Sequence, residues 1–155
     1  MKLTLNKQLA DVRAEASGRR ISETATLWGH TFELQTLIPS EDDWVQARAC
    51  SHADGVLAVT LVMPRYRIAA ALKSFDGVSV HDMFVPETDE DRATFAMLPA
   101  AERANMLRNN VYDFLCELLV DWQFVELHKV YEGLMVRQRK ALEGLNPLAK
   151  SPSKS

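Results

Sequence analysis

Histidine and cysteine are the residue types in this 155-residue sequence with the widest choice of chemistry. Cys50 and His52 are separated by one residue and Asp54 follows, so they could offer sulfur, nitrogen and oxygen ligands to zinc. The other histidines lie far away in the chain, at His30, His81 and His128. None of these residues belongs to an HExxH or a paired CxxC motif. The pattern therefore favours two ordinary residues at a helix end, and we expect no metal site and no cofactor.

No segment carries a recognisable catalytic motif. The carboxylates of Pro86–Ala93 are adjacent at a predicted helix start, where the helix dipole alone favours negative charge. No serine or cysteine stands in a GxSxG elbow, and the glycines form no phosphate-binding loop. Because triads assemble from distant residues, a small hydrolase or metal-dependent enzyme using His52 or His81 stays open as a minor alternative.

The composition is that of a soluble globular domain, with 47% apolar and 25% charged residues. A formal charge of −3 gives no general attraction to nucleic acid or to an anionic membrane. The basic run Arg137–Lys140 lacks interleaved aromatic residues and is flanked by Glu132 and Glu143, which favours charge compensation at a helix end over nucleic-acid binding. We therefore expect neither a nucleic-acid partner nor a membrane partner.

The expected compartment is the cytoplasm. Cys50 and Cys116 are far apart in sequence and are interpreted as buried, reduced thiols. Polar residues interrupt the amino-terminal segment, which lacks the apolar centre of a signal peptide, and Leu3–Ala16 could be a short amphipathic helix or a flexible arm. No apolar run is long enough to cross a bilayer.

Short apolar runs separated by turn residues predict a small sheet in the first half of the chain. Runs rich in threonine and leucine on both sides of Gly29–His30 predict a β-hairpin that ends at Pro39. The continuous apolar run Val56–Met63 has the length of a buried strand. Asp76–Gly77, which follows the alanine-rich run Arg67–Phe75, predicts the turn of a second hairpin.

Capping residues predict helices between and after these strands. Ser40, with an aspartate three residues later, resembles the start of a capping box, so a helix is expected over about Glu41–Ser51. Thr88 could cap a second helix within Glu87–Leu98. Pro99 suits the first turn of the helix that follows.

The organising stretch is Leu107–Leu145, the longest segment with helical periodicity. Apolar residues follow one helix face up to Trp122, and the series then restarts at Phe124 on nearly the opposite side. Either the helix breaks near Trp122–Val125, or one long helix buries opposite faces at its two ends. Both arrangements leave apolar surface that needs a cover.

The second apolar stripe is the candidate partner-binding face. Its members are Phe124, Leu127, Tyr131, Leu134, Leu142 and Leu145. Because the elements before it are small, they could be too few to cover both stripes, and the exposed one would bind a helical partner. Intramolecular packing of the same residues is an equal alternative.

These elements predict one α+β domain over residues 1–146, with β-hairpins in the first half and helices in the second. Gly144 can adopt a left-handed cap and Pro147 cannot continue a helix. Residues 147–155 are small, polar and basic, which is typical of a flexible tail.

The order of segments between Ile21 and Pro147 resembles the tail assembly chaperones of tailed bacteriophages. Four segments carry the resemblance: LWGHTFELQTLIPSEDDWVQA, IAAALKSFDGVSV, EDRATFAMLPAAERANML and YEGLMVRQRKALEGLNP. They match a hairpin followed by a capped helix, a strand with a central DGV, an acidic helix start with a Leu-Pro, and a carboxy-terminal helix with Tyr131, Leu134, Arg137 and Gln138.

The resemblance implies a non-catalytic function in the cytoplasm of an infected bacterium. Members of that family hold the aggregation-prone, helical tape measure protein soluble until tail tube subunits displace them. It implies the tape measure protein and the tail tube protein as partners, and a homo-oligomer as the assembly state. A permanent structural component of the tail or baseplate is the competing hypothesis, since it would use the same apolar surface.

Overall fold

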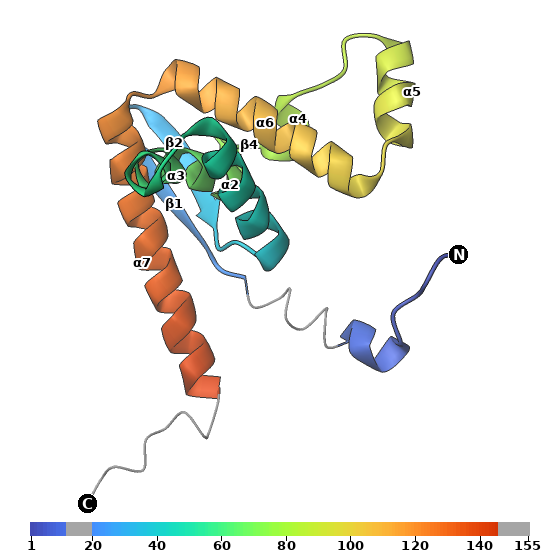
Figure 1. Cartoon of the computed structure of the whole chain (residues 1–155), viewed down its shortest axis with the longest axis horizontal. Coiled ribbons are helices and arrows are strands. Elements are labelled where there is room, and N and C mark those ends of the chain that lie inside the picture. The colour runs from blue at the N-terminus through green and yellow to red at the C-terminus, as the bar shows by residue number, and fades with distance from the viewer. Residues whose placement is uncertain (12–19, 146–155) are drawn as a thin grey trace, which may run out of the picture.

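A computed structural model describes residues 1–11 and 20–145 of the chain, which form an α+β fold as predicted (Figure 1). The elements are β1 (Ser22–Leu27), β2 (His30–Gln35), α2 (Pro39–His52), α3 (Val56–Ala71), β3 (Leu72–Phe75), β4 (Val78–Ser79), α4 (Val80–Met83), α5 (Asp89–Met97), α6 (Ala100–Leu118) and α7 (Asp121–Leu145). Residues 7–11 are also helical, within the predicted segment Leu3–Ala16. Residues 3–6 of that segment are not helical, and residues 12–16 and the predicted tail lie outside the described residues.

The strands form one antiparallel sheet in the order β1-β2-β3-β4. Both predicted hairpins are present, and each is closed by two residues of positive φ, Trp28–Gly29 and Asp76–Gly77. Positive φ at both central residues is the type I′ geometry, whose twist matches that of the flanking strands. The first turn lies one residue before the predicted Gly29–His30. Its first central residue is Trp28, and tryptophan rarely adopts a positive φ, so the sequence did not indicate it as a turn residue.

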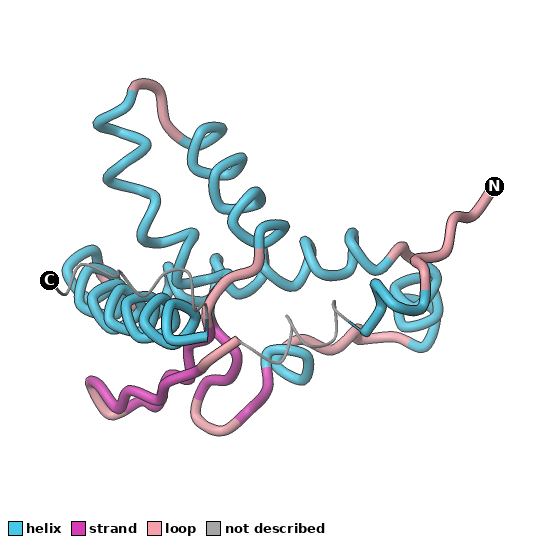
Figure 2. Tube along the Cα trace, turned by 90° about the horizontal axis from the view of Figure 1, so that it is seen from below, coloured by secondary structure: helices cyan, strands magenta, loops and turns pink. Residues whose placement is uncertain are grey.

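Alternation along β1 and β2 gives the sheet one apolar and one polar face. Ala25 pairs with Phe32 and lies on the face that the helices cover, whereas Thr24 and Thr26 point to the other side. Phe32 and Leu34 are fully buried. Figure 2 shows the strands gathered on one side of the helices, so the sheet supplies one wall of the core.

The strand predicted over Val56–Met63 is wrong, because these residues form the first half of helix α3. A continuous apolar run of this length is compatible with either structure, and only its packing decides. The second half of α3 packs between α2, α6 and α7 and is buried at Tyr66 and from Ile68 to Ala71. The second hairpin is consequently shorter than predicted, since Arg67–Ala71 is helical and β3 begins at Leu72.

Helix α2 occupies the predicted range, but Ser40 is not its cap. The helix begins at Pro39 with Ile38 as N-cap, and the Glu41 carboxylate accepts the Ile38 backbone N–H at 3.0 Å. The same carboxylate accepts from Arg20 at 2.7 Å and lies 3.9 Å from Arg108 of α6. Because Pro39 occupies the first helical position, the helix begins two residues earlier than predicted. Glu41 is then the third helical residue, which is the position that caps in a capping box.

Thr36 forms a second buried polar junction. Its hydroxyl accepts from Gln138 of α7 at 3.0 Å and from the Ile21 backbone N–H at 3.3 Å. Its carbonyl accepts from Arg20 at 3.0 Å. Since Thr36 is fully buried, these bonds fix the ends of β1 and β2 against α7.

Two helices, α6 and α7, form the carboxy-terminal part of the described chain, and they are separated at Leu119–Val120. The break lies a few residues before the predicted Trp122–Val125. Gln123 explains its position, because its side chain accepts the Val120 backbone N–H at 2.9 Å and caps the new helix. Pro99 is the N-cap of α6, and Thr88 caps α5 by accepting the Asp91 N–H at 3.0 Å.

We predict that Glu41→Ala lowers the free energy of unfolding by on the order of 2 kcal/mol, because it strands the Arg20 and Arg108 charges and removes the helix cap. Ser40→Ala is the matched control and should change it by less than about 0.5 kcal/mol. Urea unfolding of both variants measures the difference. Equal losses would show that Glu41 has no capping role.

The Asp76 carboxylate should make stability depend on pH. It accepts the Thr31 backbone N–H and contacts His30 Nδ1, each at 2.8 Å, and these two bonds, in that order, lower the pKa of Asp76 below 3.8. A carboxyl with a lowered folded pKa stabilises the fold above its unfolded pKa and loses this contribution as the pH falls through the folded pKa. The wild-type protein should therefore have a higher melting temperature than Asp76→Asn at neutral pH, and the difference between the two melting temperatures should shrink below about pH 4. A difference that is constant with pH would contradict this.

Candidate binding surface

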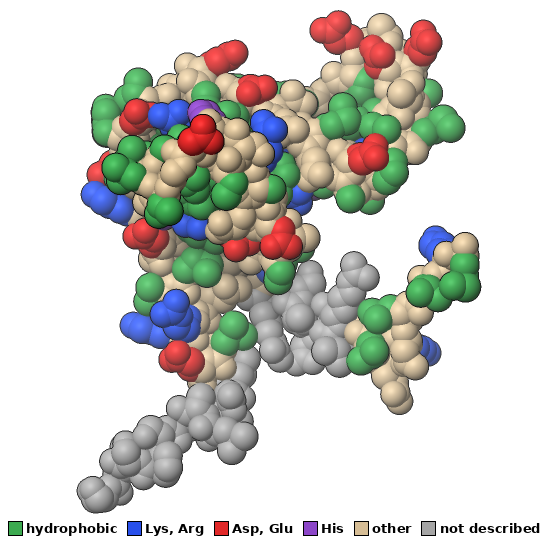
Figure 3. Space-filling view, viewed as in Figure 1, with side chains coloured by type: hydrophobic (Ala, Val, Ile, Leu, Met, Phe, Trp, Pro, Cys, Tyr) green, Lys and Arg blue, Asp and Glu red, His purple; other side chains and the backbone are tan. Residues whose placement is uncertain are grey.

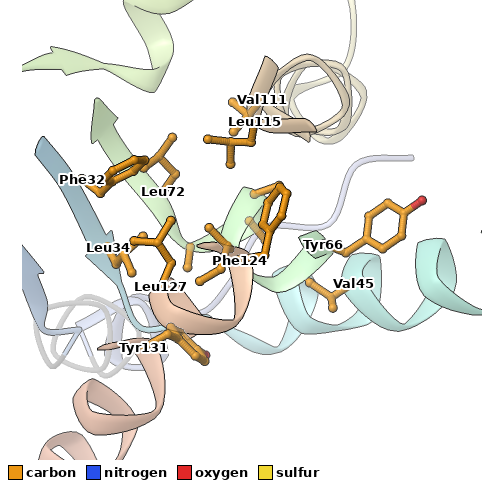
Figure 4. Close-up of a cluster of buried hydrophobic side chains, with 14 of the residues drawn as sticks. Phe32, Leu34, Val45, Tyr66, Leu72, Val111, Leu115, Phe124, Leu127 and Tyr131 are labelled. Atoms are coloured by element: carbon orange, nitrogen blue, oxygen red, sulfur yellow. The ribbon is translucent and has the colours of Figure 1, made fainter. Parts of the chain in front are cut away.

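Four residues predicted to bind a partner are part of the core instead. Phe124, Leu127, Tyr131 and Leu134 are 4% exposed or less. Figure 4 shows Phe124 and Leu127 among Leu34, Leu72 and Leu115, from the sheet and from α6. The expectation of an uncovered stripe was wrong here because α3 is a helix and, together with the sheet, supplies more cover than a short strand would.

The far end of α7 differs from its first half. Leu142 is 39% exposed, and Val136 is 47% exposed. The side chain of Leu145 lies outside the described residues. The predicted stripe is therefore internal up to Leu134 and reaches the surface at Leu142.

The exposed apolar surface lies elsewhere, where the first half of α3 meets the start of α7. Leu57, Leu61, Trp122 and Val125 are 75%, 68%, 59% and 47% exposed. We call these four residues the α3–α7 patch. Leu61 and Val125 line one groove of about 380 Å³, which joins the two helices. Figure 3 shows hydrophobic side chains on the surface of the body over α2 and α3, among charged ones.

Two side-chain contacts lie at the α3–α7 patch. Arg65 of α3 and Asp121 of α7 form an ion pair of 2.5 Å at the groove. Trp122 packs edge to face on Trp28 of the first hairpin turn, with ring centroids 5.7 Å apart. The ion pair joins α3 to α7 beside the groove, and Trp28 fixes the position of Trp122, which suits a preformed binding surface.

An aromatic cluster lies beside the patch, beneath α2. Tyr66 and Tyr112 stack with centroids 4.2 Å apart, and His52 Nδ1 lies 2.6 Å from the Tyr66 hydroxyl. Burial, followed by hydrogen bonds to Tyr66 and Cys116, raises the pKa of Tyr112. Partial desolvation by neighbouring side chains also raises the pKa of the Cys116 thiol, although the residue as a whole is exposed. Raised pKa values keep both groups protonated at neutral pH, so neither is an activated nucleophile.

The histidines have separate structural partners. His30 pairs with Asp76, and His52 with Tyr66. His81 is exposed after β4. In residues 1–11 and 20–145, no group of three His, Cys, Asp or Glu side chains is placed to hold a metal ion. Cys50 and Cys116 are both exposed, so the expected burial of the two thiols was wrong.

His128 connects α3 to α7. Its Nε2 lies 3.1 Å from Arg67 Nη1, and its Nδ1 lies 3.1 Å from the Glu132 carboxylate. Because a guanidinium only donates, Nε2 accepts and the ring proton is on Nδ1, which donates to Glu132. Burial, and then the Arg67 charge, lowers the pKa of His128. The geometry therefore describes a neutral histidine that joins two helices.

Besides the Gln138–Thr36 bond, the basic run Arg137–Lys140 has an ion pair to the sheet. Arg137 pairs with Glu23 of β1 at 2.8 Å, an ion pair between elements where the sequence suggested compensation within the helix. Among the described helices, none combines the length and the apolar character needed to cross a membrane. Comparisons of the chain with protein-family models, curated proteins and solved structures found no match.

We predict that a core substitution destabilises the fold strongly and that a patch substitution hardly changes its stability. Leu127→Ala should lower the free energy of unfolding by about 3 kcal/mol, because it leaves a cavity between α7 and the sheet. Leu61→Ser should change it by less than about 0.5 kcal/mol, because that side chain is already exposed. Urea denaturation separates the two. A large loss for Leu61→Ser would place Leu61 in the core.

Proposed function

We propose that this protein is a non-catalytic assembly chaperone of a tailed bacteriophage, which binds the helical tape measure protein in the host cytoplasm until the tail tube assembles. The observation that carries the proposal is the α3–α7 patch, an apolar surface held on a folded body. The buried part of α7 no longer supports it, because Phe124, Leu127, Tyr131 and Leu134 already have intramolecular partners.

The chemistry of the patch fits an amphipathic helix as client. Leu57 and Leu61 are four residues apart on α3, and Trp122 and Val125 are three apart on α7, so each pair presents one ridge. The groove lined by Leu61 of α3 and Val125 of α7 can receive apolar side chains at helical spacing. Arg65 and Asp121 at the groove offer polar groups that can set the orientation of the client.

A chaperone must release its client, and the composition of the patch is compatible with release. A surface of a few exposed side chains is smaller than a permanent interface requires. Repeated weak contacts along a long helical client would give the necessary total affinity, which is why we also propose that several copies act together.

The decisive experiment is coexpression with a tape measure protein, the proposed client. Wild type should keep that protein soluble, and Leu57→Asp combined with Leu61→Asp should abolish the rescue, because each charge would have to be desolvated in the complex. Met97→Asp is the matched control, since Met97 is 87% exposed and lies outside the patch.

Circular dichroism of the double variant must show an unchanged fold for the result to concern binding. Rescue that survives the double substitution would overturn the assignment of the patch. Finished particles that retain this protein would favour a permanent tail component instead.

A further inference from the structure

A second apolar hollow lies between α5 and α6, away from the α3–α7 patch. It measures about 380 Å³, and its apolar lining includes Phe84, Val85, Phe95, Leu98, Met106 and Leu107. Val85 and Met106 are 67% and 44% exposed. The helix α5, described over its whole length, contains no buried residue, so its apolar side covers only this hollow.

Residues 84–98, which include α5 and supply part of the lining of this hollow, are strongly acidic. Residues 84–98 contain four carboxylates, Glu87, Asp89, Glu90 and Asp91, against the single cation Arg92. Glu87 and Asp91 belong to the lining of the hollow itself. An occupant of the hollow should therefore combine apolar side chains with positive charge.

The amino-terminal segment Met1–Asp11 has this composition. Leu3, Leu5 and Leu9 are 82%, 45% and 55% exposed, and two lysines stand against one aspartate. Asn6 accepts the Gln8 backbone N–H at 2.9 Å and caps the helical turn of residues 7–11, which carries Leu9, while Leu3 and Leu5 precede it. Figure 3 shows hydrophobic and basic side chains together on this segment.

The chain connects the segment to a point close to the hollow. Arg20 is fixed to Glu41 at 2.7 Å, and Glu41 lies 3.9 Å from Arg108, the neighbour of Leu107 in the lining. Eight residues separate Asp11 from Arg20, and a chain of that length can span roughly 27 Å. In Figure 1 the segment also lies on the same side of the molecule as α5.

We propose that the segment Met1–Asp11 docks into the α5–α6 hollow of its own chain. Its leucines enter the apolar lining, and Lys2 and Lys7 approach Glu87 and Asp91. Because the segment and the hollow belong to one chain, docking is intramolecular, so three leucines suffice without a high intrinsic affinity. The docked segment would cover the exposed face of α5 and leave the α3–α7 patch free. This inference is independent of the proposed function.

Disulfide trapping in the full chain tests the docking. Exposed Cys50 and Cys116 are first replaced by serine. Leu5→Cys is then combined with Met106→Cys, or with Leu61→Cys as a control on the other apolar surface. Under oxidised glutathione, the first pair should close on the order of ten times faster than the control, because a disulfide forms only when the two Cα atoms approach to within about 7 Å. Lys2→Glu with Lys7→Glu should slow the first pair and leave the control unchanged.

The product identifies the occupant. A cross-linked monomer whose rate is independent of protein concentration supports docking within one chain. Cross-linked dimers that increase with concentration would overturn it and assign the hollow to the segment of a second copy. Equal rates for the two pairs, or a rate unaffected by the lysine substitutions, would also overturn the proposal, since the leucines would then be touching any apolar surface without selection.

Discussion

The burial of the second half of α3 is the contact on which the rest of this structure depends. Tyr66 and the run from Ile68 to Leu72 are enclosed by α2, α6, α7 and the sheet. Three successive alanines lie in this run, and their small side chains allow several elements to approach one helix closely. Each surrounding helix has a single apolar face, so this central helix gives them a common surface to bury.

This arrangement also explains where apolar surface remains. The first half of α3 packs against the core only through Val59, Val62 and Met63, so its other side keeps Leu57 and Leu61 exposed. The fold gains little from leucine at these positions, because side chains that stay in water contribute no burial. Apolar residues that folding does not require are better explained by a partner, which is why the α3–α7 patch carries the proposed function.

Directional polar contacts add a constraint that apolar burial lacks. Glu41 joins α2 to Arg20 and Arg108, and Thr36 joins the sheet to Gln138 of α7. A buried polar group is stable only when its partners are in place, so these contacts fix how the elements are aligned. His128 acts in the same way between α3 and α7, which gives a structural role to a residue type that also invited a metal hypothesis.

The sequence by itself determined the elements that depend on local chemistry: the hairpin turn at Asp76–Gly77, the Thr88 cap, and the long carboxy-terminal helices. Tertiary structure decided the rest. The apolar run Val56–Met63 has no periodicity that separates strand from helix, and its packing made it a helix. The stripe from Phe124 to Leu134 has the same pattern whether it faces a partner or a core, and the cover that α3 and the sheet provide made it core. Local spacing specifies which residues share a face, whereas only the assembled protein specifies what that face meets.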